Sequence, residues 1–556
     1  MRLQIALLFL TFSSKSLGNI LATTQKGTVR GRSIQSPANR TFYAFTGIPF
    51  AKPPLGKLRF QAPIEVEPWD GIKDATEDPN KCFQVNSDSD TESEDCLYAN
   101  VFTAALDLVN STKKLPVVLS IYGGAFRSGS AGYGKGGPDW FIERDIIYVT
   151  FNYRVGPFGF LSTNDLVIPG NAGLKDQQLA LKWTYENIEF FGGNKSHITI
   201  HGQSAGAASV TYQLLNPKTQ GLIVGALAES GSAFCPWAWL KDNTAYTINL
   251  ARIVNNNTEP FNTSSTSLLK LLQQAPARAI DAASGTLYSH STSNIPLPTL
   301  EPQHDGAFIT EPMYELLDAG RVVKVPLFIG INSEEEIGMS KNIPNLQSIA
   351  KKFDSNYEAL LPWQLKSASE ENRTIAANLL KEAYVGNDTF TNHLGKVIAY
   401  TSDAEFTRSI IRFGEMYARF SPVYFYQFSY KGPWGINTFD YIDGADNVSH
   451  GEETRYISVL KVGSYDNTKY DEFPASDVLT HMRMIKLWSN FYKFGNPTPE
   501  PIDLLSNITW PTVSENAFTY LHINTTLELK DTPKSPKYNA WRSAFLDHGV
   551  RPLVIF

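Results

Sequence analysis

A short segment with the chemistry of a serine nucleophile lies at residues 201–206, which read HGQSAG. Alternating apolar and polar residues over 197–201 predict a strand before it, and the apolar run 205–215 predicts a helix after it. The two glycines let the chain turn sharply with no side chain in the way, so the serine between them can expose its hydroxyl above a sheet edge. Ser204 is therefore the candidate nucleophile, and the alternative is an ordinary turn rich in glycine and serine.

A serine hydroxyl is a weak nucleophile at neutral pH, so it needs a neutral imidazole to take its proton and a carboxylate to orient that imidazole. Around this kind of turn the order along the chain is nucleophile, acid, histidine. His450 lies in a loop and is followed by glycine, whereas His393 and His481 lie in helix-like stretches. His450 is the candidate base, and the alternative is a solvated or capping loop histidine.

The candidate acids are three adjacent carboxylates, Glu334, Glu335 and Glu336, which follow the apolar run 325–331. Adjacent carboxylates are typical of a solvated turn or of the first turn of a helix, where the helix dipole favours negative charge. We expect one of them to orient His450 and the other two to have that ordinary role.

A place for the developing oxyanion is predicted at residues 121–126, which read IYGGAF and follow another apolar run. An oxyanion hole needs backbone N–H groups that no side chain obstructs. Together with Ala205, the residue after the nucleophile, this turn offers three such donors. The alternative is an ordinary glycine-rich loop.

Strands with near-continuous apolar sequence recur along the chain with helical segments between them. They are predicted at residues 115–122, 145–153, 197–201, 224–227, 325–331 and 423–428. Such strands suit the centre of a mostly parallel sheet covered on both faces, so the fold class is α/β. Ligands of such sheets bind beyond the carboxyl ends of the strands, where the candidate serine, acids and glycine-rich turn all lie. The segments 243–310 and 346–420 are predicted to be largely helical excursions that build the walls of a pocket.

The composition of the 556-residue chain, 42% hydrophobic and 19% charged, suits one large domain over residues 19–556, because no linker, repeat or long charge block divides it. The net charge is −6, and the scattered lysines and arginines form no basic patch, which argues against a nucleic-acid partner. No metal-ligand spacing appears, so no metal is expected.

Residues 1–18 resemble a cleaved signal peptide, and no other window is long and apolar enough to span a membrane, so the sequence predicts secretion without a membrane anchor. Of the three cysteines, Cys82 and Cys96 bracket a polar segment and are the expected disulfide, with Cys235 free and buried; spacing alone allows three pairings. The glycosylation candidates are Asn39, Asn110, Asn194, Asn256, Asn262, Asn372, Asn387, Asn447, Asn507 and Asn524.

Beyond the turn at Ser204, the chain resembles the type-B carboxylesterase and cholinesterase family over nearly its whole mature length. The motifs that carry the resemblance are EDCLYANV at 94–101, NYR at 152–154, NAGLKDQ at 171–177, FGGN at 191–194 and ESGS at 229–232. The resemblance implies an α/β-hydrolase fold and a serine carboxylesterase that needs no cofactor and acts on small-molecule esters.

The same resemblance assigns individual residues. The family pattern G-x-N-x-x-E places the acid on Glu335, with Glu336 as the alternative because of its spacing to Gly338. The oxyanion donors become Gly124, Ala125 and Ala205. Trp237 corresponds to a wall of the acyl pocket, and the alternative is simple core packing. The family also implies two scaffold ion pairs, Arg59 with Glu94 and Arg154 with Asp176.

The expected function is hydrolysis of carboxylic esters through an acyl-enzyme. Acetylcholine specificity is not expected, because the segment 83–95 is short and has no cation-binding tryptophan. Gln203 and the Gly124-Ala125 pair resemble juvenile hormone esterases of insects, although Asn447 departs from their pattern, so a narrow juvenile hormone or pheromone esterase is one alternative. An inactive cholinesterase-like adhesion protein is the other; such relatives lose the serine or histidine and carry a membrane span.

Overall fold

The structure, a computed structural model, describes residues 20–87, 89–258, 260–291, 294–435, 438–514 and 517–556. Residues 1–18, the predicted signal peptide, lie outside this part of the chain.

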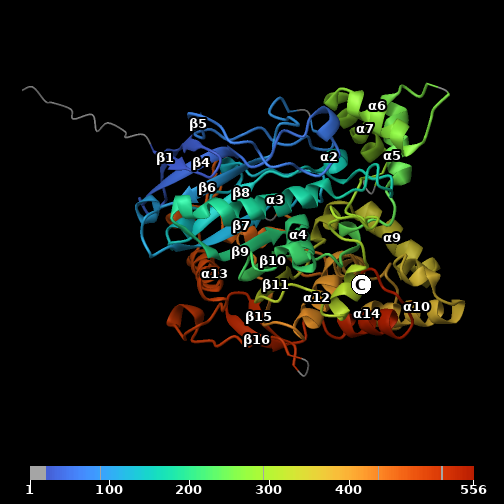
Figure 1. The fold of residues 1–556 in the computed structure, drawn as a ribbon. Helices are drawn as coiled ribbons and strands as arrows, with labels where there is room; N and C mark the ends of the chain where they lie inside the picture. Colours follow the sequence, from blue (N-terminus) through green and yellow to red (C-terminus); the bar gives the residue numbers. More distant parts are fainter. Residues whose placement is uncertain (1–19, 88, 259, 292–293, 436–437, 515–516) are drawn as a thin grey trace, which may run out of the picture.

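An eleven-stranded sheet runs through the centre of the molecule (Figure 1), in the order β16-β15-β12-β11-β10-β9-β7-β8-β6-β4-β3. Neighbours from β8 to β15 pair in parallel, and the antiparallel pairs lie toward the two edges. The strands are β3 (Arg32–Gln35), β4 (Thr41–Pro49), β6 (Tyr98–Thr103), β7 (Leu115–Ile121), β8 (Ile147–Phe151), β9 (Gly193–Gln203), β10 (Gly225–Glu229), β11 (Leu327–Asn332), β12 (Val423–Phe428), β15 (Thr519–Ile523) and β16 (Leu527–Asp531). The predicted, mostly parallel central sheet is confirmed.

Helices cover both faces of this sheet. They are α1 (Asp139–Ile142), α2 (Gly156–Phe160), α3 (Ala172–Asn187), α4 (Ala205–Leu215), α5 (Thr244–Val254), α6 (Ser265–Gln274), α7 (Ala277–His290), α8 (Met313–Asp318), α9 (Ile343–Ser355), α10 (Glu370–Val385), α11 (Leu394–Ser402), α12 (Arg408–Tyr417), α13 (Ala475–Phe494) and α14 (Lys537–Leu546). Two small sheets complete the fold, one of β1 (Leu21–Thr23), β2 (Thr28–Arg30) and β5 (Ile72–Asp74), the other of β13 (Lys461–Val462) and β14 (Tyr465–Asp466).

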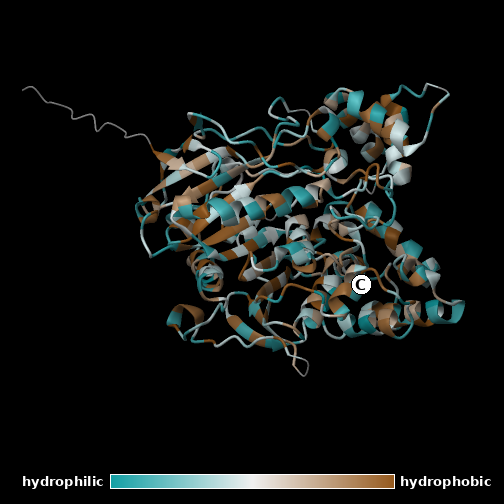
Figure 2. Cartoon of the chain, in the orientation of Figure 1, coloured by the Kyte–Doolittle hydropathy of each residue, from teal (hydrophilic) through white to brown (hydrophobic). Residues whose placement is uncertain are grey.

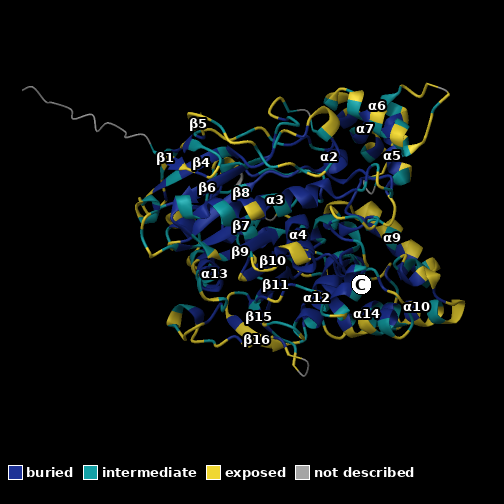
Figure 3. Cartoon of the chain, viewed as in Figure 1, coloured by how far each residue is buried: buried dark blue, intermediate teal, exposed yellow. Residues whose placement is uncertain are grey.

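The apolar sequence of the central strands explains their position. Every residue of β10, β11 and β12 is buried, and the sheet is mostly brown in the hydropathy view (Figure 2). One apolar cluster packs α3, α4 and α12 on one face of the sheet, and a second packs α13 on the other. Burial is therefore greatest along the sheet, and exposed residues gather on outlying helices such as α6 and α10 (Figure 3).

The two predicted excursions are also helical. Residues 243–310 contain α5, α6 and α7, which pack on one another around a separate apolar cluster. Residues 346–420 contain most of α9, then α10, α11 and α12, and a π-helical turn over Asp403–Thr407 joins α11 to α12 without a break.

Some strand boundaries differ from prediction. The strand expected over 145–153 begins only at Ile147, because Asp145 adopts φ 56° in the turn after α1, outside the extended region. The strand expected over 197–201 extends to Gly193 and Gln203, since the polar residues at both ends pair through their backbones with neighbouring strands.

Candidate active site

Ser204 lies between the end of β9 and the first residue of α4, with φ 60° and ψ −125°. This backbone conformation is strained for a residue with a side chain, and such strain persists where the surroundings enforce it. The surroundings are tight: a Cβ at Gly202 would lie 2.3 Å from the Gly206 carbonyl oxygen, and one at Gly206 would lie 2.0 Å from the Ile121 oxygen. Ser204 remains half-buried, and its N–H donates to the Glu229 carbonyl at 2.8 Å. The structure thus gives the turn the form expected of a nucleophile elbow.

His450 lies beside Glu335, with 2.7 Å between Nδ1 of the imidazole and Oε2 of the carboxylate. The other carboxylate oxygen of Glu335 accepts the Asn332 N–H at 2.8 Å, and its side chain is completely buried. The His450 side chain is 28% exposed, so one edge of the imidazole is accessible. Among the described residues, His450 has its carboxylate contact with Glu335 and none with Glu336. This geometry favours Glu335 over Glu336 as the partner of the histidine.

Neighbouring strand ends bring these groups together. Glu335 follows β11, and His450 lies in the loop after β12, the next strand of the sheet. The two loops are joined by hydrogen bonds from the Glu334 N–H to the Val448 carbonyl (3.0 Å) and from the Asn332 amide to the Ser449 carbonyl (2.7 Å). Residues up to 117 positions apart are therefore held together by hydrogen bonds to the main chain of the loop that carries His450.

The glycine-rich turn after β7 lies against the elbow. A Cβ at Gly123 would lie 2.9 Å from the Ser204 Cβ. Gly124 and Ala125 have φ 116° and 54°, so this stretch of backbone follows neither a strand nor a right-handed helix. Among the described residues, the N–H groups of Gly124, Ala125 and Ala205 donate to no protein acceptor, so they are available to an anion.

A pair of tyrosines holds the start of this turn. The Tyr122 hydroxyl donates to the Tyr153 carbonyl at 2.8 Å, and the Tyr153 hydroxyl donates to the Tyr122 carbonyl at 2.9 Å. Their rings stack with centroids 4.4 Å apart. Burial raises the pKa of both phenols, so both remain donors at neutral pH.

Gln203, the residue before the candidate nucleophile, contacts the candidate base. Its Nε2 lies 3.3 Å from Nε2 of His450, the ring nitrogen that faces away from Glu335. The sequence marked Gln203 only as a clue to the kind of esterase; its position next to Ser204 was the signal for this contact.

Aromatic rings form a wall beside the imidazole. The Phe406 ring lies 4.6 Å from the His450 ring and 5.2 Å from the Trp237 ring, measured between centroids. Trp237 therefore lies one ring away from the imidazole, and its role as a wall of the acyl pocket stays a prediction. Phe406 was not predicted, because it lies in the π-helical turn Asp403–Thr407, which has no sequence motif.

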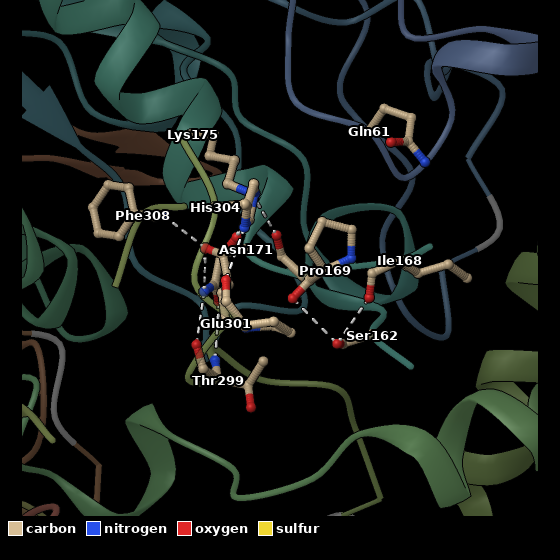
Figure 4. A network of polar contacts seen from close by, with 12 residues as sticks. Gln61, Ser162, Ile168, Pro169, Asn171, Lys175, Thr299, Glu301, His304 and Phe308 are labelled. Atoms are coloured by element: carbon tan, nitrogen blue, oxygen red, sulfur yellow. Dashed lines mark hydrogen bonds and ion pairs between the residues drawn. The ribbon is translucent and has the colours of Figure 1, made fainter. Parts of the chain in front are cut away.

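The segment that supports this wall is anchored to α3 (Figure 4). Lys175 forms an ion pair with Glu301 at 2.6 Å, and the Asn171 amide donates to the Thr299 carbonyl at 2.7 Å. Thr299 is preceded by Pro298, whose carbonyl accepts the Leu240 N–H at 2.9 Å. Leu240 lies three residues after Trp237 in the chain. The ionic network thus holds the backbone next to the aromatic wall.

Several carboxylates near the site are shifted toward their neutral forms. Burial raises the pKa of Glu336 to about 7, helped by the neighbouring carboxylates Glu405 and Glu335 and opposed by His450. Burial, together with Glu229 and Glu335, also holds the pKa of Glu453 well above its usual range. Burial and mutual repulsion therefore limit the negative charge that these carboxylates carry around His450.

A buried histidine, His201, lies behind the elbow, and no role was predicted for it. His201 Nε2 is 3.3 Å from a Glu229 oxygen, and its Nδ1 is 3.1 Å from the Tyr148 hydroxyl. These three residues line a cavity of about 250 Å³ that also reaches Gly123 and Gln203. Gln203 therefore borders both the imidazole and this cavity.

The remaining expectations concern the scaffold. Cys82 and Cys96 form a disulfide, and Cys235 is free and buried. The ion pairs Arg59–Glu94 (2.6 Å) and Arg154–Asp176 (2.7 Å) are both present.

His481 lies within α13 as expected, but His393 precedes α11 and pairs with Asp388 on the surface, so its expected helical position was wrong. In the described ranges no helix could cross a membrane, and no group of His, Cys, Asp and Glu could hold a metal ion.

A sheet of this order, with the turn at Ser204 beyond its strand ends, defines an α/β-hydrolase. The structure is similar to that of juvenile hormone esterase from Manduca sexta with OTFP covalently attached (TM-score 0.80, 27% identity, 95% of this chain and 99% of that one). A family profile described as Carboxylesterase family matches residues 18–541. The chain belongs to the carboxylesterase family.

Curated relatives agree over most of their length. The chain is 31% identical to Venom carboxylesterase-6 of Apis mellifera (94% of each chain) and 31% identical to Juvenile hormone esterase of Tribolium castaneum (88% of this chain, 85% of the relative). It is 33% identical to Esterase FE4 of Myzus persicae (91% and 89%). The protein is a carboxylic ester hydrolase that acts on small-molecule esters, as the sequence predicted.

Proposed function

We propose that Ser204, His450 and Glu335 carry out this hydrolysis as nucleophile, base and orienting acid. The single observation that supports the proposal best is the 2.7 Å contact between His450 and the buried Glu335, on the strand ends next to the strained Ser204. The Glu335 carboxylate holds the proton on Nδ1 of His450, so the lone pair lies on Nε2, where the serine proton would replace the contact with the Gln203 amide.

The reaction then proceeds in two halves. Ser204 Oγ attacks the ester carbonyl while His450 takes its proton, and the tetrahedral oxyanion accepts hydrogen bonds from the N–H groups of Gly124, Ala125 and Ala205. His450 returns the proton to the alcohol, which leaves, and a serine acyl-enzyme remains. Water attacks that acyl group with His450 again as base, which releases the acid and restores the serine. Each oxyanion donor is worth roughly 10²–10³ in rate.

Replacing the nucleophile tests this assignment. Ser204→Ala should reduce kcat/KM for a 4-nitrophenyl ester by a factor of about 10⁴ or more, because the oxyanion donors alone remain. The far-UV circular dichroism and the unfolding midpoint should stay unchanged. A fluorophosphonate probe should label the wild type and fail to label the variant. Near-normal turnover by Ser204→Ala would refute the assignment.

We also propose that residues 1–18 are a signal peptide and that residues 19–556 form one secreted, glycosylated domain. The disulfide supports an oxidising compartment, and all ten predicted glycosylation sites are exposed or half-buried. Expression in insect cells, followed by N-terminal sequencing and glycosidase treatment of the medium, tests this. An intracellular product that retains Met1 would contradict it.

For the substrate, a general carboxylesterase is our first proposal. The similarity to two juvenile hormone esterases supports narrow hormone specificity as the second. A panel from short aryl esters to a juvenile hormone analogue separates them: comparable kcat/KM values across the panel favour the first, and a preference of several hundredfold for the hormone analogue favours the second. An inactive adhesion protein would turn over none of them.

A further inference from the structure

A cavity of about 570 Å³ opens beside α3, and neither Ser204 nor His450 lines it. Its volume lies within the range of small-molecule binding sites. Its sides come from α3, from the turn that follows α4 and from the segment around Phe308. We call this space the α3 cavity, and it is separate from the candidate active site.

One side of the α3 cavity is fixed by a buried carboxylate. Glu301, whose side chain is completely buried, accepts the Lys175 ammonium at 2.6 Å and the Phe308 N–H at 2.9 Å. Both Lys175 and Phe308 line the cavity. The same carboxylate accepts the Asn171 amide at 2.9 Å. The segment around Phe308 is therefore held against α3 before any ligand binds, which lowers the cost of ordering the site.

Apolar side chains cover a large part of the α3 cavity. Leu179 and Tyr185 belong to α3, and Leu222 belongs to the turn after α4. All three are half-buried, so each keeps apolar surface in contact with water, whereas Phe308 beside them is buried. An aliphatic chain laid against these side chains would remove that surface from water, which is favourable.

Two lysines that line the α3 cavity are already paired with carboxylates. Lys175 is bound to Glu301 as described above. Lys182 pairs with Glu65 at 2.5 Å and with Glu186 at 3.7 Å. Glu186 is the one carboxylate among the described residues that line the cavity. Its charge is matched by Lys182, so it does little to repel an anion.

Lys218 lies at the same cavity without such a partner. It belongs to the short 3-10 turn Pro217–Thr219, and its backbone N–H donates to the Asn216 side chain at 3.0 Å. Its ammonium donates to the Asp305 carbonyl at 3.3 Å, and among the described residues no carboxylate lies within ion-pair distance of it. An ammonium has three N–H donors, so two remain for an anion. The α3 cavity thus combines apolar sides with one available positive charge.

We propose that the α3 cavity binds a carboxylic acid of the class that this enzyme releases, with an aliphatic chain along Leu179, Tyr185 and Leu222 and the carboxylate on Lys218. An uncharged chain would leave Lys218 unused, and a small anion would leave the apolar sides uncovered. An amphipathic carboxylate matches both parts of the site. The proposal needs only the ester hydrolysis that the family carries out, and not the roles proposed for Ser204, His450 and Glu335.

The test measures the binding of decanoate by isothermal titration calorimetry, at constant ionic strength and pH 8. The active site is first blocked covalently with a fluorophosphonate, so that decanoate cannot bind there as a product. Two probes separate the parts of the site: 1-decanol has the same chain without the charge, and propionate has the charge with almost no chain.

Three variants locate the site. Lys218→Gln removes the charge, and Leu179→Glu places a carboxylate in the apolar side at a position where a helix tolerates it. Lys352→Gln, at an exposed position on α9, is the matched control. All three should hydrolyse a short 4-nitrophenyl ester like the wild type, which shows that they are folded. The comparison between variants holds whichever serine the fluorophosphonate labels.

We expect one decanoate per blocked wild-type chain, with 1-decanol and propionate at least tenfold weaker. Lys218→Gln should weaken decanoate about tenfold and leave 1-decanol unchanged, because one charge pair at a partly exposed site is lost. Leu179→Glu should weaken both decanoate and 1-decanol. Lys352→Gln should change neither.

Four results would overturn the proposal. The first is no saturable binding of decanoate to the blocked wild type. The second is equal affinity for decanoate and 1-decanol, which would leave Lys218 without a role. The third is decanoate binding that neither Lys218→Gln nor Leu179→Glu changes. The fourth concerns a neighbouring cavity of about 620 Å³, which Lys218 and Arg321 both line: binding that Leu179→Glu leaves intact and Arg321→Gln abolishes would assign the acid to that cavity instead.

Discussion

A negative charge placed at Gln203 should shift the pH dependence of the reaction. The Gln203 Nε2 lies 3.3 Å from His450 Nε2, the nitrogen that accepts the serine proton in the proposed reaction. Gln203→Glu keeps the size of the side chain and puts a carboxylate at that contact. A carboxylate favours the imidazolium over the neutral imidazole, and the imidazolium cannot act as a base.

The size of the effect follows from the distance and the exposure. Two unit charges about 4 Å apart interact by roughly 4 kcal/mol in a partly buried setting and about 1 kcal/mol in bulk water. The His450 side chain is 28% exposed, so its surroundings lie between these limits. The acid limb of the kcat/KM profile should therefore move to higher pH by roughly one to three units.

The assay is kcat/KM for an uncharged 4-nitrophenyl ester from pH 4.5 to 9.5. The control is Gln347→Glu, the same change at an exposed position on α9. We expect Gln203→Glu to lose activity at pH 6 and to approach its own plateau only above pH 8, while the control follows the wild type. An acid limb that does not move in Gln203→Glu would refute both the contact and the role of His450 as base.

Two further predictions concern folding and the elbow. Burial lowers the pKa of His481 to about 4, so the unfolded chain binds a proton between pH 6.5 and 4 and the folded chain does not; the free energy of unfolding should fall by about 3 kcal/mol as the pH drops through that window. In urea titrations at pH 7 and 4.5, His481→Gln should lose less stability over this range than the wild type, and an identical loss would contradict the cause. Gly206→Ala should lower kcat/KM at least a hundredfold, because its Cβ would lie 2.0 Å from the Ile121 oxygen. Gly134→Ala, which meets nothing within 4 Å, should be neutral, and equal losses in both would show that packing at the elbow is not the reason.

Elements with an uninterrupted apolar pattern and clear ends could be predicted well. The helix expected over 205–215 and the strand expected over 423–428 match α4 and β12 residue for residue. The limits of β9 could not be predicted, because its polar ends are held in the sheet by backbone pairing, which side-chain hydropathy does not register.

The residues of the site also divide into those that could be predicted from the sequence and those that could not. Ser204, His450 and Glu335 could be nominated because a local motif, chain order and family resemblance are visible in the sequence. The contact of Gln203 with His450 joins residues 247 positions apart. The contact of Phe406 with the imidazole and the pairing of His201 with Glu229 likewise depend on which segments become neighbours, so only the folded chain shows them.

The two tyrosines that hold the glycine-rich turn have a consequence for inhibitor design. Because Tyr122 and Tyr153 each donate to the main chain of the other, the turn is fixed before any ligand arrives. A transition-state analogue that forms a tetrahedral adduct would then bind without ordering this backbone, so its binding entropy should carry no penalty from the turn. Tyr153→Phe removes one of the two bonds and should make binding of the same analogue entropically less favourable, which calorimetry can measure.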